Sequence, residues 1–449
     1  MRAGHKRVLI QAATGAGKTV LIAQMLAQAS AKGSRSWFVV HRTELLEQSV
    51  ETFILSAGIH TGIIAAGFSE TPLAPVQVCA VQSLARRQAR FAPPDLLVFD
   101  EAHHQAAVSW AKVAASFPAA YQIGLTATPQ RLDRRGLKAY FDDLLCGPST
   151  ADLIRDGYLA PYTLFAPTVA GPALDGVGTV AGDYNKKALR IAMDNSTIVG
   201  DAVQYYHEHS PTARALVFMW SVESSEQIAQ RFREAGIPAE HIDGETSRVE
   251  RQARMARFRA GETRVICNVD LFGEGLDVPA VDAVFLCRPT QSLGLYLQQV
   301  GRGLRMSPGK TAVKIFDHAG NWTRHGLPDA ARVWTLEDTP KKKKVEPTGR
   351  RCLKCHAVSR AGAEMCAVCG TPFEVKPRQV QKVSGTLAEW RAMSYTPTRA
   401  DATARHEYPR GSLAYWRAEA KRGGYKPGWA YIRHRDEQLK RLGRHAEDL

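Results

Sequence analysis

Short apolar runs alternate along the chain with longer segments in which apolar residues recur at helical spacing. In the first third of the chain these runs occupy residues 7–11, 36–40, 76–82, 95–100 and 121–128. A second set occupies residues 214–220, 239–243, 263–269, 282–287 and 311–318. Nearly continuous apolar strands that alternate with helices are typical of parallel sheets covered on both faces. The pattern predicts an α/β fold with two parallel-sheet domains in tandem.

Changes in composition mark the borders of these domains. Residues 166–184, between the two sets of runs, are rich in Gly, Pro and Val, and we interpret them as a loop near the domain join. After residue 338 the chain becomes basic and polar. The expected parts are a first domain at residues 1–150, a second at 151–338, a basic linker at 339–351, a cysteine module at 352–375 and a basic tail at 376–449.

The bulk composition indicates a globular protein of a reducing compartment. Apolar residues make up 45% of the chain, and no run approaches the roughly 18 residues of a membrane span. The N-terminus shows no cleavage-site pattern of a signal peptide. Four of the eight cysteines are scattered through apolar contexts, unlike a disulfide framework. We therefore expect a cytoplasmic protein without a membrane partner.

The net charge of +15 is concentrated at the C-terminal end. Residues 340–449 contain 24 Lys and Arg against 11 Asp and Glu, a net charge of +13, whereas residues 1–339 carry +2. A basic tail on a nearly neutral body favours a polyanionic partner held mainly by the tail. The alternative is a tail whose charges serve only to keep it solvated.

A glycine-rich loop follows the first predicted strand and opens a predicted helix. Residues 12–19, AATGAGKT, fit the phosphate-loop pattern in the context that this motif requires. Lys18 would reach the β- and γ-phosphates of ATP, and Thr19 would ligate Mg²⁺. The alternative is a glycine-rich turn that binds nothing. The backbone cradle for the phosphates would be formed by Thr14, Gly15, Ala16 and Gly17 together with Lys18 and Thr19.

An acidic motif, DEAHH at residues 100–104, follows the apolar run that ends at residue 100. A carboxylate at the tip of a buried strand is placed to hold Mg²⁺ beside bound phosphates, and Asp100 has this position. Glu101 is suited to orient and deprotonate the attacking water. The alternative is an acidic strand end that caps the next helix, but the phosphate loop in the same domain favours a nucleotide site.

The order of these and further motifs resembles that of the superfamily 2 helicases and translocases. The likeness covers about residues 1–336. Residues 288–321 are similar to the RadD-type DNA repair helicases, which belong near the restriction-enzyme motor subunits and XPB, and the cysteine module resembles the same branch. The matching segments are HRTELLEQ (41–48), VQSLARR (81–87), DEAHH (100–104), TATP (126–129), NVDLFGEGLDVP (268–279) and QQVGRGLR (298–305).

This resemblance implies two RecA-like domains with ATP bound in the cleft between them. Arg302 and Arg305 match the family's arginine fingers, which reach the γ-phosphate from the second domain. A guanidinium there neutralises charge that develops during phosphoryl transfer, and only when the cleft is closed. Gln298 matches the glutamine that positions water or phosphate, and Gly275 and Asp277 match the motif that contacts the ribose side of the nucleotide.

Three short polar residues, His103, Thr126 and Thr128, match the positions that link the ATP site to the second domain and to the nucleic-acid groove. Such residues also cap and staple loops, so plain structural hydrogen bonding is the alternative for all three.

The resemblance also implies an adenine-reading segment, with an Arg and a Gln, shortly before the phosphate loop. The chain begins at Met1 and leaves no room for it. We expect either that the true start lies upstream or that ATP is bound through its phosphates and ribose alone. The first is favoured, because a helix packed on the first sheet would otherwise be lost too.

Four cysteines, Cys352, Cys355, Cys366 and Cys369, form a CxxC–x10–CxxC arrangement. Paired thiolates at this spacing can enclose a tetrahedral Zn²⁺, and so short a segment has little other core. We predict a structural zinc ribbon, with a redox or coincidental pairing as the alternative. DNA and a protein surface are both open as its partner.

The composition of the linker and that of the tail each allow two interpretations. PKKKKV at residues 340–345 resembles a nuclear import signal, but a phosphate-contacting or merely solvated linker is favoured. In the tail, aromatic residues are interleaved with basic ones, a composition that holds single-stranded nucleic acid. The alternative is a small helical hairpin whose core these aromatics form. They are Trp390, Tyr415, Trp416, Tyr425, Trp429 and Tyr431.

The sequence therefore predicts a bacterial or phage-encoded ATP-dependent DNA helicase or translocase that uses ATP, Mg²⁺ and Zn²⁺. Its substrate would be single-stranded DNA, or duplex DNA with single-stranded regions, in DNA repair, recombination or phage DNA metabolism. The tail would grip this DNA or recruit a repair or single-strand-binding protein. The alternatives are an RNA helicase with the same two RecA-like domains, a motor subunit that serves a separate nuclease, and a nucleic-acid-binding protein with an impaired ATPase.

Overall fold

The computed structural model divides the chain into two compact units, Met1–Lys376 and Pro377–Leu449. All named strands lie in the first unit. The residues that the structure describes are 4–41, 43–104, 107–130, 135–166, 174, 176–180, 182–194, 202–271, 281–338, 349–360, 362–373, 413–422, 430, 433, 434 and 437.

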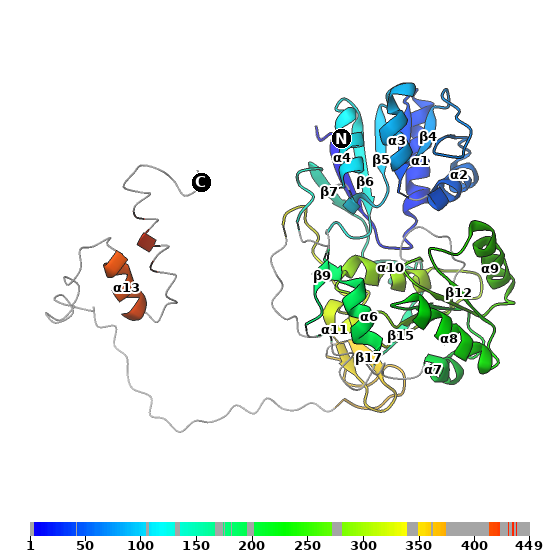
Figure 1. Cartoon of the computed structure of the whole chain (residues 1–449), viewed down its shortest axis with the longest axis vertical. Coiled ribbons are helices and arrows are strands. Elements are labelled where there is room, and N and C mark those ends of the chain that lie inside the picture. Colours follow the sequence, from blue (N-terminus) through cyan, green and yellow to red (C-terminus); the bar gives the residue numbers. More distant parts are fainter. Residues whose placement is uncertain are drawn as a thin grey trace. The chain divides into compact units, whose positions relative to one another are not determined.

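The first domain is built on a seven-stranded parallel sheet in the order β3-β4-β2-β5-β6-β1-β7 (Figure 1). Its strands are β1 (Arg7–Gln11), β2 (Ser36–Val40), β3 (Gly62–Ile64), β4 (Val76–Ala80), β5 (Leu96–Phe99), β6 (Tyr121–Thr126) and β7 (Asp143–Cys146). Its helices are α1 (Lys18–Ala31), α2 (Thr43–Ala57), α3 (Val81–Arg87) and α4 (Val108–Ser116), with the 3-10 turns η1 (Gln88–Arg90) and η2 (Ala102–His104).

Successive side chains of each strand point to opposite faces of this sheet, and helices cover both faces. On β2, Phe38 and Val40 join the core beneath α1 and α2, whereas Trp37 and Val39 join the core beneath α3 and α4. All four side chains are buried. Because both faces of the strand need apolar residues, the strand reads as a continuous apolar run in the sequence.

The second domain has an eight-stranded sheet in the order β12-β13-β11-β14-β15-β8-β17-β16. The strands are β8 (Tyr162–Phe165), β11 (Ala215–Phe218), β12 (Ala239–Ile242), β13 (Val265–Asn268), β14 (Ala283–Leu286), β15 (Val313–Asp317), β16 (Gly349–Arg351) and β17 (Ala357–Arg360). The helices are α5 (Thr150–Arg155), α6 (Lys186–Asp194), α7 (Ala202–His209), α8 (Val222–Glu234), α9 (Arg248–Ala260), α10 (Leu293–Leu304) and α11 (Asn321–His325). Helices α9 and α10 pack on one face of this sheet, and α7 and α8 on the other.

Each of the ten predicted apolar runs contains a strand, and the predicted α/β class with two parallel-sheet domains is confirmed. The segment interpreted as a loop before residue 185 instead contains a short antiparallel hairpin of β9 (Thr179–Val180) and β10 (Asp183–Tyr184), followed by α6. The sequence pattern did not predict β3, β7 and β8. Strand β3 has only three residues, β7 has two exposed residues, and the first two residues of β8 are only half-buried.

The cysteine module continues the second sheet. Strand β17 pairs antiparallel with β8, with Ala357 opposite Phe165 and Val358 opposite Leu164, and β16 pairs with β17.

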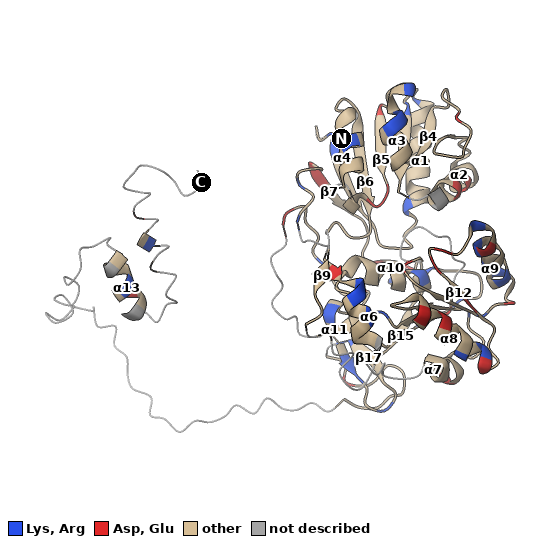
Figure 2. Ribbon diagram, in the orientation of Figure 1, with Lys and Arg blue, Asp and Glu red and all other residues tan. Residues whose placement is uncertain are grey.

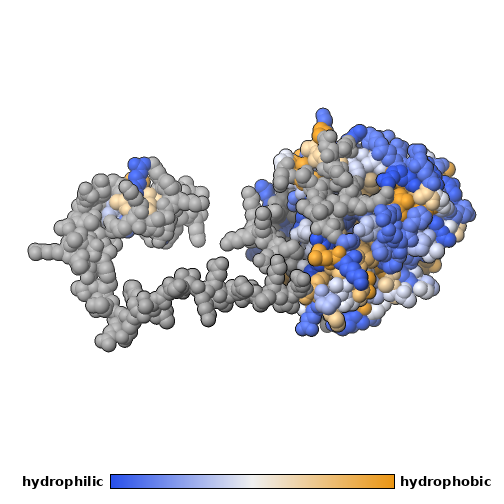
Figure 3. Space-filling model, turned by 90° about the horizontal axis from the view of Figure 1, so that it is seen from below, coloured by the Kyte–Doolittle hydropathy of each residue, from blue (hydrophilic) through white to orange (hydrophobic). Residues whose placement is uncertain are grey.

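Lys and Arg lie on the hairpin of β16 and β17 and on α6 and α9 (Figure 2). Apolar side chains are also exposed on the module, at Leu353, Met365 and Val368. Apolar patches lie among polar residues on the face of the first unit shown in Figure 3.

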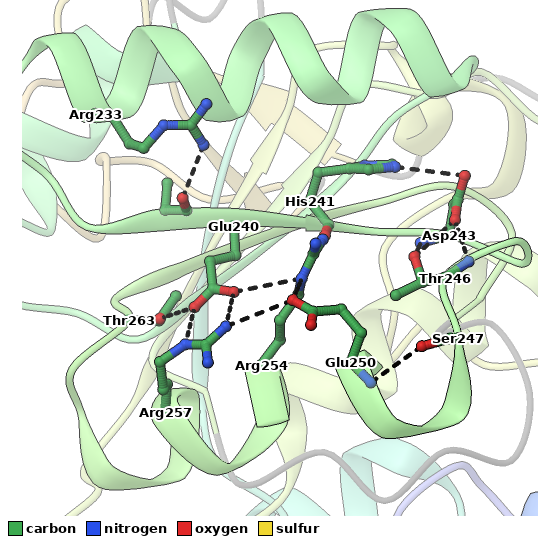
Figure 4. A network of polar contacts seen from close by, with 11 residues as sticks. Arg233, Glu240, His241, Asp243, Thr246, Ser247, Glu250, Arg254, Arg257 and Thr263 are labelled. Atoms are coloured by element: carbon green, nitrogen blue, oxygen red, sulfur yellow. Dashed lines mark hydrogen bonds and ion pairs between the residues drawn. The ribbon is translucent and has the colours of Figure 1, made fainter. Parts of the chain in front are cut away.

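A polar network joins β12, an edge strand of the second sheet, to α9 (Figure 4). Arg257 donates two hydrogen bonds to Glu240, at 2.9 and 2.7 Å, and Thr263 donates another. Arg254 lies 3.6 Å from the same carboxylate. Charged side chains on an edge strand oppose pairing with a second sheet, so this network both packs α9 and protects the edge.

A segment that follows α11, residues 326–338, returns to the first domain; we call it the return segment. The Leu336 carbonyl accepts hydrogen bonds from the N–H groups of Leu137 and Lys138, at 2.8 and 3.1 Å. The Leu336 side chain packs against the core of the first domain. Gly136 leaves room for this contact, because a Cβ there would clash with the Leu336 carbonyl. The two domains are therefore joined both by the chain after β7 and by the return segment.

The second unit is described at helix α13 (Leu413–Arg422) and four later residues. Tyr415 and Trp416 meet edge to face at 5.2 Å, and Trp416 Nε1 donates a hydrogen bond to Glu437 at 2.9 Å. These contacts favour the helical-core interpretation for these two aromatics. The other four aromatics of that prediction, Trp390, Tyr425, Trp429 and Tyr431, lie outside the described residues. Among the described residues of both units, no helix combines the length and the apolar character that crossing a membrane requires.

Candidate functional site

The glycine-rich loop lies between β1 and α1, as predicted. Gly15 and Gly17 have φ angles of 86° and 76°, in the left-handed region that disfavours any other residue. Gly17 is the N-cap of α1, so the first N–H groups of this helix face the loop. Thr14, Ala16 and Thr19 complete this loop. A loop of this kind at a helix N-terminus can bind an anion through its backbone N–H groups.

Lys18 is the point at which the predicted charged residues of both domains converge. Its ammonium group donates hydrogen bonds to the carbonyls of Ala12 and Ala13, at 3.1 and 3.3 Å. Burial lowers the pKa of Lys18, and the carboxylates of Glu101 and Asp100 oppose this shift.

Two further charges act on Lys18 from the second domain. Arg302 and Arg305 both lower the pKa of Lys18. Arg305 also lies beside the phosphate loop, where a Cβ at Gly15 would come within 3.6 Å of its Cγ. The structure thus brings the predicted lysine, the two acidic residues and the two arginines to one place. Five ionisable groups of both signs at one place suit a site that binds a negatively charged ligand together with a cation.

The acidic motif begins where β5 ends. The pKa of Asp100 is raised to about 6, chiefly by burial and next by the neighbouring Glu101 carboxylate, with Lys18 acting in the opposite direction. Glu101 has a φ angle of 48°, uncommon for a residue with a side chain, and its N–H donates to Asp100 Oδ1 at 3.1 Å. Adjacent partly buried carboxylates are the oxygen donors that Mg²⁺ uses beside phosphates, so Asp100 fits its predicted role as a ligand of Mg²⁺, while the role of Thr19 stays a prediction.

A chain of polar contacts leads from the acidic motif to α10. His103 Nδ1 lies 3.4 Å from Glu101 Oε2 and 3.1 Å from Thr126 Oγ1. Thr126 Oγ1 donates to the Thr128 carbonyl at 2.9 Å. Thr128 Oγ1 reaches the first turn of α10, where a Cβ at Gly294 would lie 2.9 Å from it. The predicted linking residues are thus hydrogen-bonded to one another, and they also touch the second domain.

Helix α10 carries the predicted Gln298 and Arg302, and Arg305 is its C-cap residue. The side chains of Gln298 and Arg302 are buried. Gly301 faces the phosphate loop so closely that a Cβ there would lie 2.5 Å from Cβ and Cγ2 of Thr14. The helix therefore meets the first domain at the glycine and presents its polar residues beside that contact.

The C-terminal end of α10 is held by a residue that the sequence did not single out. Lys310 Nζ donates hydrogen bonds to the carbonyls of Val281, at 2.6 Å, of Arg305, at 2.9 Å, and of Gly303. Burial lowers the pKa of Lys310 to about 8. Lys310 lies in the loop SPGKT, which has no periodicity, so no signal in the sequence could have identified this contact.

A cavity of about 150 Å³ lies beside the phosphate loop. Residues of both domains and of the return segment line it, among them Gln11, Thr14, Val300, Leu304, Pro328 and Trp334. Gly275 and Asp277, the remaining predicted nucleotide contacts, lie outside the described residues.

The four predicted zinc ligands come together in the cysteine module. All four Sγ atoms lie within 4.8 Å of one another, with the pairs Cys352–Cys369 and Cys355–Cys366 at 3.5 Å. These separations are too long for disulfides, for which the S–S distance is about 2.05 Å. Tetrahedral Zn²⁺ with Zn–S bonds of about 2.3 Å places its sulfurs about 3.8 Å apart. The four thiols therefore fit a zinc ion.

Two family models match the chain. The model for the res subunit of type III restriction enzymes matches residues 1–131, and that for the helicase conserved C-terminal domain matches residues 198–307. A solved fragment of an HsdR subunit of a type I restriction enzyme from Vibrio vulnificus shares the fold. Its TM-score is 0.55 at 23% identity, over 76% of this chain and 64% of that one.

Similar proteins come from viruses, eukaryotes and archaea. A 51.5 kDa protein of a Lactococcus phage is 35% identical over 376 residues, which cover 82% of this chain and 79% of the phage protein. A protein of Saccharomyces cerevisiae named as a candidate ATP-dependent helicase, IRC3, is 29% identical over 343 residues, 71% of this chain but only 49% of the yeast protein. The DNA 3'-5' translocase XPB2 of Sulfurisphaera tokodaii is 25% identical over 344 residues, 67% of this chain and 75% of that protein.

These findings agree with the ordered motifs and with the two RecA-like sheets. They do not separate the RadD-type branch from its neighbours, so that branch stays a prediction. The chain belongs to the superfamily that contains this branch, the superfamily 2 helicases, which are ATP-hydrolysing enzymes that act on nucleic acids.

Proposed function

We propose that this protein is an ATP-driven DNA translocase or helicase. The observation that carries the proposal is the contact of α10 with the phosphate loop, where Gly301 meets Thr14 and Arg305 lies beside Gly15. The electrostatic effects of Asp100, Glu101, Arg302 and Arg305 on the pKa of Lys18 support it. Hydrolysis that needs groups from both domains is coupled to their relative movement, and this movement is what advances a motor along a strand.

Each residue of the site has a role in this proposal. Lys18 and the backbone of residues 14–19 hold the phosphates, with Thr19 and Asp100 as ligands of Mg²⁺, which would neutralise the β- and γ-phosphate oxygens. Glu101 takes a proton from the attacking water, which Gln298 helps to orient. Arg302 and Arg305 offset the negative charge that develops on the transferred phosphoryl group.

Thr126, Thr128 and His103 connect the acidic motif to the arginine helix. Their contacts run from Glu101 to the first turn of α10, so they would transmit the state of the nucleotide to the second domain. Gly275 and Asp277 would contact the ribose.

DNA is favoured over RNA as the substrate. The archaeal relative is named a DNA translocase, and the other models and relatives include subunits of restriction enzymes. Likeness to a phage protein supports a phage or bacterial origin and, with it, a role in phage DNA metabolism, recombination or repair in the cytoplasm. Zn²⁺ would be bound by the four cysteines, and the basic second unit would hold DNA or a DNA-bound protein.

The proposal is tested by measuring ATP turnover of the full chain alone and with single-stranded DNA, duplex DNA and RNA. We expect DNA to stimulate turnover strongly and RNA to stimulate it little. Glu101→Gln should abolish hydrolysis and keep ATP binding, whereas Lys18→Ala should weaken binding itself. Equal stimulation by RNA would contradict the preference for DNA, and normal turnover of Glu101→Gln would contradict the role of Glu101 as the base.

A further inference from the structure

Asp183, in the segment that the sequence pattern predicts to be a loop, is turned into the second domain. Its side chain is only 15% exposed and accepts three hydrogen bonds from one short turn. The donors are the hydroxyl of Thr290 at 2.9 Å, the N–H of Gln291 at 2.7 Å and the guanidinium of Arg288 at 3.2 Å. Its neighbour Tyr184 adds a fourth contact, because its hydroxyl accepts from the Gln291 side chain at 2.7 Å.

The turn at residues 288–292 joins β14 to α10 and has little freedom. Thr290 is fully buried, its N–H donates to Asn321 Oδ1 at 3.0 Å, and its hydroxyl accepts from the N–H of Ser292 at 2.9 Å. Ser292 is the N-cap of α10 and accepts from the N–H of Leu295 at 3.1 Å. Asn321 thus holds the turn from one side and Asp183 from the other.

The charge of Asp183 matters as well as its shape. Arg288 is 7% exposed and contacts the carboxylates of both Asp183 and Asp270. Without Asp183, the buried Arg288 would keep only the carboxylate of Asp270, which also pairs with Lys186, so its guanidinium would lose part of its charge compensation. The turn would lose this ion pair together with the two hydrogen bonds that Thr290 and Gln291 donate to Asp183.

Any shift of this turn is passed to the residues that meet ATP. Helix α10 starts directly after the turn, and Gly294 in its first turn packs against Thr128. Gln298 and Arg302 follow on the same rigid element. A misplacement of about 1 Å at a catalytic group, caused from a distance, costs about 10²-fold in rate.

We propose that Asp183 is a positioning residue of the ATP site, which fixes the start of α10 and thereby aims Gln298, Arg302 and Arg305 at the phosphate loop. The hairpin β9–β10 is then part of the ATPase machinery and acts through the turn at residues 288–292. This inference rests on the proposed function, since it takes α10 as the carrier of the arginines that act in hydrolysis. Lys310 at the other end of α10 completes the support, so the helix is held at both ends.

The test compares Asp183→Ala and Asp183→Asn with Lys187→Ala, a change at an exposed position on α6 in the same part of the chain. We expect kcat for DNA-stimulated ATP hydrolysis to fall at least about tenfold in Asp183→Ala, with KM for ATP changed less than about threefold, because the first domain holds the phosphates. Asp183→Asn keeps the acceptor oxygen for Thr290 and Gln291 but loses the charge, so its kcat should lie between. Lys187→Ala should match the unmodified protein.

Hydrogen exchange of the same proteins gives a readout that does not depend on turnover. In Asp183→Ala, the amides of residues 288–297 should exchange faster, while those of residues 7–31 around the phosphate loop should not change. Unaltered exchange at residues 288–297, or an unaltered kcat, would overturn the positioning role, and so would equal losses in kcat and in ATP affinity. If the unmodified protein hydrolysed no ATP with any nucleic acid, the proposed function would fall, and the exchange data alone would decide whether Asp183 fixes α10.

Discussion

Replacing Gly301 with alanine tests whether α10 touches the phosphate loop during hydrolysis. The new Cβ would lie 2.5 Å from Cβ and Cγ2 of Thr14. Because carbon atoms pack at about 3.5–4.0 Å, α10 would have to withdraw from the loop by about 1 Å or more. Arg302 is the next residue and would move with it. A displacement of this size costs about 10²-fold in rate, or about 2.7 kcal/mol of transition-state stabilisation.

The stability of the second domain should not fall together with the activity of Gly301→Ala. Alanine is favoured over glycine inside a helix by about 0.5–1 kcal/mol. The three atoms nearest to the added methyl group all belong to Thr14, so the clash is with the first domain. We therefore expect Gly301→Ala to lose about 100-fold in kcat while the second domain unfolds at the same or a higher temperature. A loss of activity with this sign of stability change is not a folding defect.

The assay is steady-state ATP hydrolysis at saturating nucleic acid, combined with scanning calorimetry. Thr14→Gly removes both clashing carbons, so the double variant should recover much of the activity that Gly301→Ala loses, relative to Thr14→Gly alone. Wild-type kcat in Gly301→Ala would show that the two residues do not meet in the hydrolysing state. Lack of recovery in the double variant would place the loss somewhere other than Thr14.

Three further changes probe other parts of the chain. Lys310→Met leaves three carbonyl oxygens without their donor, and each buried unsatisfied group costs about 1–3 kcal/mol, so chemical denaturation should show a loss of about 3 kcal/mol or more. An unchanged midpoint would contradict the hydrogen-bonding role of Lys310. Native mass spectrometry should find one zinc ion per chain. Cys352→Ser or chelation should release the ion and lower the melting temperature, whereas Cys146→Ser should do neither. A chain that lacks zinc but keeps its full stability would contradict a structural role of the metal. Deletion of residues 377–449, at the border of the two compact units, should weaken DNA binding and reduce its salt dependence, while the ATP site stays intact; an unchanged salt slope would assign the basic tail to another partner.

The predictions that succeeded share a physical cause. Strands such as β2 are buried on both faces, so every position must be apolar and the run is visible in the sequence. The phosphate loop and the cysteines are visible because their chemistry needs particular residues at fixed short spacings. In both cases the requirement is local.

The features that were missed depend on contacts between distant parts of the chain. Asp183 is one acidic residue in a Gly-rich segment, and only the fold brings the turn before α10 to its carboxylate. The return segment is held by the Leu336 carbonyl, a backbone atom that every residue type supplies, so no residue pattern reveals it. Lys310 is equally indistinct, because its partners are backbone carbonyls from three separate positions.

The pairing of β17 with β8 gives the cysteine module a consequence beyond local stability. Strand β8 is parallel to β15 on one side and is covered on the other side by β17. If the cysteines lost their metal and the hairpin detached, the unpaired N–H and C=O groups of β8 would become an open sheet edge. Open edges recruit strands from other molecules and promote aggregation. Zinc supply would then set how much of the protein stays free of aggregates in the cell, independently of whether the ATP site is intact.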